Sequence, residues 1–162
     1  MHTESLERMR RELRRTPGQN VLDVGAYDVN GSYRPICEAL GKSYTGLDIV
    51  PGPNVDIVAA DPYRYQIPDG SFDIVISGQA MEHVEQPWRW VPELARVLKP
   101  GGTLIIITHH NYPEHRYPVD CWRILPDGMR VLFDIAGVLC DYQIEMFNAH
   151  DIIGRATRCP SA

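Results

Sequence analysis

The sequence lacks any apolar run long enough to cross a lipid bilayer. A transmembrane helix needs roughly 20 consecutive apolar residues, and the apolar runs of this chain have only the length of strands. Residues 1–15 are polar and do not contain the apolar core of a secretory signal peptide. These absences predict a protein without membrane association, located in the cytoplasm.

Lysine is scarce, and the cysteines are not grouped. Lys42 and Lys99 are the only lysines, and the formal net charge is −5. Binding to nucleic acid through phosphate contacts needs a surplus of basic side chains, so we predict no nucleic-acid partner. The arginines within a predicted helix at 3–16 are interpreted as a solvated face. The 4 cysteines form no CxxC pair, which argues against a zinc ribbon and predicts free thiols.

What the chain does contain is a series of short apolar runs separated by helical or turn segments. Strands are predicted at 21–24, 43–48, 55–60, 72–77 and 103–108, and helices at 3–16, 32–41, 87–98 and 126–137. Two last runs, 138–147 and 151–157, are expected to form an antiparallel hairpin at a sheet edge. The pattern predicts one α/β domain over residues 1–162, with a doubly wound, mostly parallel seven-stranded sheet.

The stretch 20–33 organises the rest of the chain. Its apolar strand ends at Gly25 and a helix is expected from Gly31, so free N–H groups would surround a turn that a ligand can approach. Asp48 and Asp61 end the next two strands, where a carboxylate can bind a ribose or an adenine amine. The alternative for each aspartate is a capping role in a turn. We expect these strand ends to share one rim and to bind a single nucleoside.

The composition of the turn after the first strand separates two kinds of adenosine-containing cofactor. Ala26, Tyr27 and Asp28 stand where a dinucleotide-binding fold needs glycines beside the pyrophosphate. Bulk and negative charge there would crowd a diphosphate. The turn therefore disfavours NAD and FAD, and with them a nicotinamide-dependent oxidoreductase.

Together these motifs resemble those of the class I S-adenosylmethionine-dependent methyltransferases, in particular the small type 11 proteins. The segments that carry the resemblance are VLDVGA (21–26), GLD (46–48), AADPYRYQIPDGSFDIVISGQAMEHV (59–84) and LARVLKPGGTLIII (94–107). It covers residues 19–157 and implies a Rossmann-like fold with S-adenosylmethionine as cofactor. Residues 115–133 are also similar to small methyltransferases that modify sugars and surface polysaccharides.

The resemblance implies roles for individual residues. It places the cofactor against Asp23, Gly25, Ala26, Tyr27, Asp48, Ile49, Asp61, Pro62, Ser77, Gly78 and Gln79. The chain departs from the family pattern at Tyr27, which replaces the second glycine of GxGxG, so we expect a rearranged turn in which Tyr27 covers the methionine part of the cofactor.

The acceptor side is expected in the polar loop 109–123. A hydroxyl acceptor needs a base, and histidine titrates in a suitable range; His109 is the first candidate and His83 the second. Structural, hydrogen-bonded histidines are the alternative. Residues expected to contact the acceptor are His110, His115, Tyr117, Asp120 and Arg123. No metal site is predicted, because these histidines and carboxylates lack a regular spacing such as HExxH.

The favoured hypothesis is an enzyme that transfers a methyl group to a hydroxyl or amine of a small molecule, with sugars among the candidate acceptors. The alternative is a catalytically weak or inactive cofactor-binding module that acts as a partner subunit or sensor. Methylation of nucleic-acid base amines is disfavoured, because residues 77–80 do not match the Asn/Asp-Pro-Pro-aromatic motif of those enzymes. No cap is inserted over the pocket, so a second subunit could close it, and a homodimer is expected.

Overall fold

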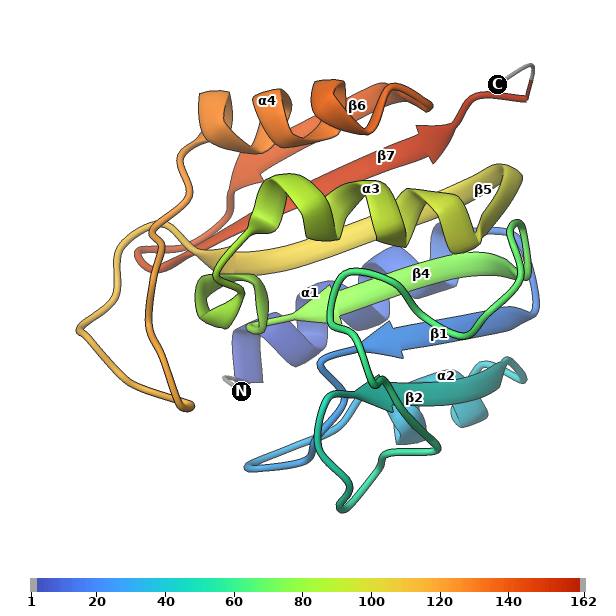
Figure 1. The fold of residues 1–162 in the computed structure, drawn as a ribbon, viewed down its shortest axis with the longest axis horizontal. Helices are drawn as coiled ribbons and strands as arrows, with labels where there is room; N and C mark the ends of the chain where they lie inside the picture. The colour runs from blue at the N-terminus through green and yellow to red at the C-terminus, as the bar shows by residue number, and fades with distance from the viewer. Residues whose placement is uncertain (1–2, 161–162) are drawn as a thin grey trace.

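The computed structural model describes residues 3–160 and is built on a seven-stranded sheet with the order β3-β2-β1-β4-β5-β7-β6 (Figure 1). The strands are β1 Asn20–Val24, β2 Ser43–Asp48, β3 Ile57–Val58, β4 Phe72–Gly78, β5 Leu98–His109, β6 Leu139–Met146 and β7 Asp151–Arg158. Strands β1 to β5 pair in parallel, whereas β7 is antiparallel to β5 and β6. The predicted sheet, with its antiparallel edge hairpin, is confirmed.

Helices cover both faces of this sheet. They are α1 Thr3–Arg15, α2 Arg34–Ala39, α3 Pro87–Val97 and α4 Pro126–Ala136, with a 3₁₀ turn, η1, at Met81–His83. In Figure 1, α3 and α4 lie in front of the sheet and α1 and α2 behind it. Two apolar clusters follow this division, one including Leu94 and Phe133 and the other including Met9 and Leu13. Within residues 3–160, no helix combines the length and apolarity that a membrane crossing requires.

The third strand is shorter than the sequence predicted. It covers Ile57–Val58 rather than 55–60. The carboxylate of Asp56 accepts the backbone N–H of Gly46 at 2.7 Å and also pairs with Arg34 at 2.7 Å. A side chain therefore occupies a backbone group that a longer strand ladder would have used.

Other boundaries shift for local reasons. The helix predicted at 32–41 contracts to α2, because Pro35 belongs in a first turn and Gly41 ends the helix with φ of +69°. Strand β5 begins at Leu98 instead of 103, and its pairing with β4 is interrupted by an irregularity after Phe72. The extra residues lie in β5, where Gly101 has a left-handed φ of +78°.

The prediction of four free thiols is wrong for one pair. Cys140, near the start of β6, and Cys159, directly after β7, form a disulfide. The antiparallel register of β6 and β7 brings these positions together, and scattered spacing along the chain does not reveal it. Cys37 is a buried free thiol and Cys121 an exposed one.

Candidate functional site

The carboxyl ends of β1, β2 and β3 meet at one edge of the sheet. The backbone N–H of Gly25 donates to the carbonyl oxygen of Leu47 at 2.9 Å, and that of Ala59 donates to the carbonyl oxygen of Asp48 at 2.8 Å. Asp61 follows two residues beyond Ala59. Gly25, Asp48 and Asp61 therefore lie along one rim.

Gly25 allows the chain to turn sharply out of β1. Its φ of +82° lies in the left-handed region that favours glycine. A Cβ atom at this position would stand 2.4 Å from the Cβ atom of Ala80, beyond the end of β4. The hydroxyl of Ser77 in β4 donates to the carbonyl oxygen of Val24 at 2.6 Å. Contacts between β1 and β4 thus fix the position of the turn that follows β1.

Asp48 combines a structural role with spare hydrogen-bonding capacity. Its carboxylate accepts backbone N–H groups from Tyr27 at 3.0 Å, Ile49 at 2.7 Å and Val50 at 3.3 Å. A carboxylate offers about four acceptor positions, so a ribose hydroxyl can still be bound. The Ile49 side chain beside it is 54% exposed and presents an apolar surface suited to a flat ring.

The Tyr27 side chain packs against Gly52. Its ring is so close to Gly52 that a Cβ atom there would be 2.2 Å from the ring carbon Cε2. The ring therefore borders the loop that follows β2, on the Asp48 side. That Tyr27 covers the methionine part of the cofactor, as the resemblance suggests, stays a prediction.

Asp61 and Asp23 occupy different environments. Asp61 is exposed, and its Oδ1 accepts the backbone N–H of Tyr63 at 2.7 Å, so it begins a turn beside the equally exposed Pro62. Asp23 is buried in β1 and accepts a hydrogen bond from the hydroxyl of Tyr44 at 2.6 Å. Burial raises the pKa of Asp23 to about 7, and the bond from Tyr44 only partly opposes this shift.

A buried network holds His109 at the end of β5. Its Nδ1 lies 2.8 Å from Asp151 Oδ1, and both residues are 1% exposed. Asp151 also accepts hydrogen bonds from the Ser5 hydroxyl at 2.9 Å and from the amides of Asn148 at 3.0 Å and Gln79 at 3.1 Å. Burial opposes ionisation, but the bonds from His109, Asn148 and Ser5 lower the pKa of Asp151 to about 2. Asp151 is therefore an anion that accepts the Nδ1 proton of His109.

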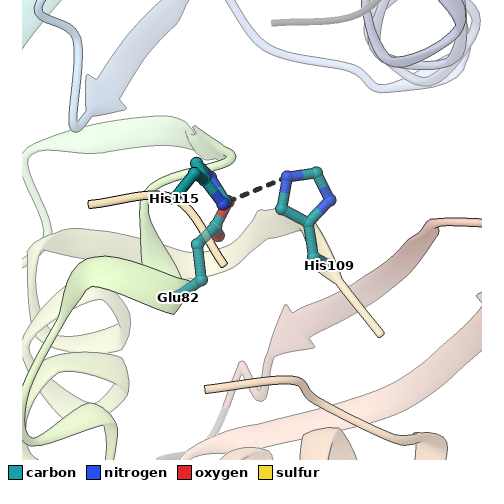
Figure 2. Close-up of side chains that lie close together, drawn as sticks. All are labelled: Glu82, His109 and His115. Atoms are coloured by element: carbon teal, nitrogen blue, oxygen red, sulfur yellow. Dashed lines mark ion pairs between the residues drawn. The ribbon is translucent and has the colours of Figure 1, made fainter. Parts of the chain in front are cut away.

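The other ring nitrogen of His109 faces Glu82, as Figure 2 shows. Its Nε2 lies 3.3 Å from Glu82 Oε1, and His115 Nε2 lies 4.0 Å from the same oxygen. Glu82 is completely buried in η1, and its Oε2 accepts the hydroxyl of Thr108 at 2.7 Å. We call Glu82, His109 and His115 the EHH cluster.

His83 and His110, two other predicted site residues, hold loops in place. His83 Nδ1 lies 2.6 Å from the carbonyl oxygen of Val119 and therefore donates to it, while its ring meets the His115 ring edge-on at 4.9 Å. His110 Nε2 lies 3.1 Å from the carbonyl oxygen of Asn148. Both residues therefore match the alternative of a structural, hydrogen-bonded histidine.

The predicted acceptor residues lie in the loop 110–125, between β5 and α4. Asp120 and Arg123 form a two-bond ion pair at 2.6 and 2.7 Å, and this pairing holds the pKa of Asp120 well below its usual range. These two side chains stabilise the loop itself. Tyr117 is 60% exposed and is the most accessible of the predicted acceptor contacts.

The side chain of Gln79, which was predicted to contact the cofactor, donates hydrogen bonds to Ser5 and Asp151.

The sequence patterns did not single out Glu82, Ser5 or Asp151. Glu82 could have been noticed from its position next to His83, just past a strand end. Ser5 and Asp151 had no local signal, because 146 residues separate them along the chain.

Comparisons with known proteins point to one family. A family model described as a methyltransferase domain matches residues 22–106. The 2-methyl-6-phytyl-1,4-hydroquinone methyltransferase of Synechocystis sp. is 34% identical over 130 residues, which are 73% of this chain and 40% of that protein. The demethylmenaquinone methyltransferase of Renibacterium salmoninarum is 34% identical over 99 residues, 56% of this chain and 41% of its own.

The same likeness extends to solved structures. A SAM dependent methyltransferase from Archaeoglobus fulgidus superposes with a TM-score of 0.73 at 17% identity, covering 94% of each chain. This similarity supports the fold. The chain spans only 40% and 41% of the length of the two relatives named above.

Proposed function

The chain belongs to the methyltransferase-domain family, and on this premise we propose that it transfers a methyl group from S-adenosylmethionine to a hydroxyl group of a small molecule. The observation that carries the proposal is the single rim formed by Gly25, Asp48 and Asp61, with the buried His109 at the end of β5 on the same sheet edge. Family membership confirms S-adenosylmethionine as the cofactor.

The residues of the rim fit this cofactor. Gly25 has the left-handed φ that opens the turn after β1, and Asp48 retains acceptor capacity beside the exposed Ile49. Asp48 would hold the ribose hydroxyls, Ile49 would pack on the adenine, and Asp61 would accept from the adenine amine. The bound cofactor supplies a methyl group activated by a positively charged sulfur.

The side chains of the protein then have two tasks. The first is to align the acceptor with the methyl group, because correct positioning removes much of the barrier to a displacement reaction. The second is to remove the proton from the acceptor hydroxyl. His109 can accept it at Nε2, since Asp151 holds the proton at Nδ1 and thereby selects the tautomer.

The names of two relatives indicate a class of acceptor. The names of the two proteins given above specify a hydroquinone and a demethylmenaquinone. They support a ring-bearing acceptor of the quinol type more than a sugar, and neither favours the alternative of an inactive partner module. The exposed side chains of Tyr117 and Trp88 provide aromatic surface that suits such a ring.

A binding experiment tests the cofactor site. We expect Asp48→Ala to weaken S-adenosylhomocysteine binding at least tenfold, because hydrogen bonds to a charged group contribute roughly 1.5–3 kcal/mol. Asp48→Asn, which keeps an acceptor for the backbone, should lie between this variant and wild type. Isothermal titration calorimetry measures the affinities, with Asp127→Ala as an exposed control carboxylate on α4. Unchanged affinity in Asp48→Ala would contradict the proposed site.

A turnover experiment tests the reaction. Release of S-adenosylhomocysteine is measured with a panel of alkylated hydroquinones, simple phenols, sugars and small amines. Turnover with the hydroquinones or phenols supports the proposal, and turnover with sugars or amines alone would correct the acceptor class. Tight cofactor binding without turnover on any of them would favour the inactive module.

A further inference from the structure

Glu82 is completely buried beside the imidazoles of His109 and His115. The residue is 0% exposed, and its Oε1 has no hydrogen-bond partner within residues 3–160. In that part of the chain its ion-pair contacts are to the imidazoles of His109 and His115, and none is to lysine or arginine. A buried carboxyl oxygen without a partner is unfavourable. A cation bound beside Oε1 would supply that partner.

The two histidines present the nitrogen that a metal ion needs. The Nδ1 of His109 is held by Asp151 at 2.8 Å, and the Nδ1 of His115 lies 3.2 Å from the carbonyl oxygen of Pro113. Both rings therefore direct Nε2 toward Glu82. Histidine ligands of metal ions commonly donate their second N–H to a carboxylate or a backbone carbonyl in this way.

The distances are close to those of a ligand set. One ligand atom from each of Glu82, His109 and His115 lies within 4.8 Å of the other two. An ion with bonds of about 2.0–2.2 Å would hold such atoms about 3–3.5 Å apart, and the contact between Glu82 and His109 is already 3.3 Å. The His115 contact, at 4.0 Å, is the one that must shorten. His115 belongs to the loop 110–125 and its side chain is 25% exposed, whereas Glu82 and His109 are buried, so His115 is the ligand expected to shift on binding.

From this geometry we infer that the EHH cluster binds one divalent transition-metal ion, with Glu82 Oε1, His109 Nε2 and His115 Nε2 as ligands. Two imidazoles and one carboxylate suit Zn²⁺ and its first-row neighbours. Three protein ligands leave coordination positions open for water or for an oxygen of the acceptor.

The inference rests on the proposed function and makes its acceptor side more specific. A metal ion held there would lower the pKa of a bound acceptor hydroxyl, and the proton would then leave to solvent. His109 would serve as a ligand, which replaces the role of base proposed for it above, and Asp151 would position this ligand. An acceptor with a phenolic hydroxyl fits such a site.

Metal titration of the full chain, freed of any affinity tag and stripped with EDTA, tests the inference. Co²⁺ is added while the visible absorption is recorded, and Zn²⁺ binding is measured by calorimetry. We expect one ion per chain. Glu82→Gln and His115→Ala should each weaken Co²⁺ binding by about 100-fold or more, because replacing even outer residues of metal sites commonly costs 10–100-fold.

The matched control is His150→Ala. His150 is an exposed histidine whose Nδ1 bonds to the carbonyl oxygen of Asn111, and it lies outside the EHH cluster. Its removal should leave Co²⁺ affinity within about twofold of wild type. Thermal unfolding of each metal-free variant shows whether the chain remains folded, and a variant that unfolds is replaced by the conservative change His115→Gln.

The outcomes separate the inference from the function on which it rests. Wild type that takes up no stoichiometric Co²⁺ or Zn²⁺, or uptake that survives both Glu82→Gln and His115→Ala, overturns the metal site. Cofactor affinity of the metal-free chain is measured in parallel. Normal cofactor binding without metal uptake would reject only the metal, whereas metal uptake without cofactor binding would reject only the proposed function.

Discussion

Asp23 couples the protonation of one buried carboxyl group to the stability of the whole chain. Burial raises its pKa from 3.8 to about 7 in the folded state. The folded chain therefore binds this proton more tightly than the unfolded chain does. The contribution of Asp23 to the free energy of unfolding is fully present below about pH 4 and is lost as the pH rises through about 7.

Replacement of Asp23 by asparagine tests this coupling. The amide oxygen can still accept the bond from Tyr44, and no charge has to be buried. We expect Asp23→Asn to be more stable than wild type at pH 8, by on the order of a few kcal/mol, and to differ much less at pH 4. Urea unfolding of both proteins at the two pH values measures the difference. An equal difference at both pH values would show that Asp23 is not the titrating group.

Asp48 shows how much a local sequence pattern can predict about the role of one residue. Asp48 was assigned either to a ribose or to a turn cap, and the structure shows that it caps the turn while retaining acceptor capacity. These two roles share one cause, because a carboxylate at a strand end is close both to the next backbone N–H groups and to the ligand edge. The sequence alone could not distinguish the turn cap from the ribose ligand, and the geometry of Asp48 allows it to fill both roles.

At the scale of secondary-structure elements, α1 does more than cover the rear face of the sheet. Met9 and Leu13 are fully buried against β1, β4 and β5, while Ser5 reaches Asp151 from the first turns of the helix. The helix therefore links the stability of the sheet to the position of His109. The sequence pattern showed the apolar stripe of this helix but not the role of its serine.

Removal of the Ser5 hydroxyl should reveal this link. Ser5→Ala leaves Asp151 with its bonds from His109, Asn148 and Gln79, so we expect a several-fold decrease in kcat with an unchanged cofactor affinity. The measurements are turnover with the best acceptor of the panel and calorimetry with S-adenosylhomocysteine.

The control for this helix prediction is Ser43→Ala, at the exposed start of β2, the end of the strand away from the rim. Ser43→Ala should change neither kcat nor the affinity for S-adenosylhomocysteine. A fall in cofactor affinity and in melting temperature without a change in kcat would assign Ser5 a structural role only.

At the scale of the molecule, stability is expected to be unevenly distributed. The central strands β1, β4 and β5 are almost entirely buried under helices on both faces. Residues 59–71, by contrast, contain neither helix nor strand. We expect the slowest amide hydrogen exchange in β4 and β5 and much faster exchange in 59–71.

Ligand addition should alter this pattern in a defined place. Binding of S-adenosylhomocysteine is expected to slow exchange at 25–28, 48–50 and 59–63, where the rim lies, and to leave α4 unchanged. Hydrogen exchange followed by mass spectrometry resolves these segments. Protection confined to α4 and β6 would place the cofactor at the wrong edge of the sheet for the proposed function.

Local order was largely determined by the sequence itself. Apolar runs of strand length, turn residues between them and polar residues at strand ends are properties of neighbouring amino acids, and they sufficed to predict the sheet, its hairpin and the strand ends at Gly25 and Asp48. Only the tertiary structure decided the rest. The EHH cluster, its support by Ser5 and Asp151, and the disulfide between Cys140 and Cys159 unite residues from distant segments, and their proximity depends on strand order, register and the path of a loop, which no local pattern encodes.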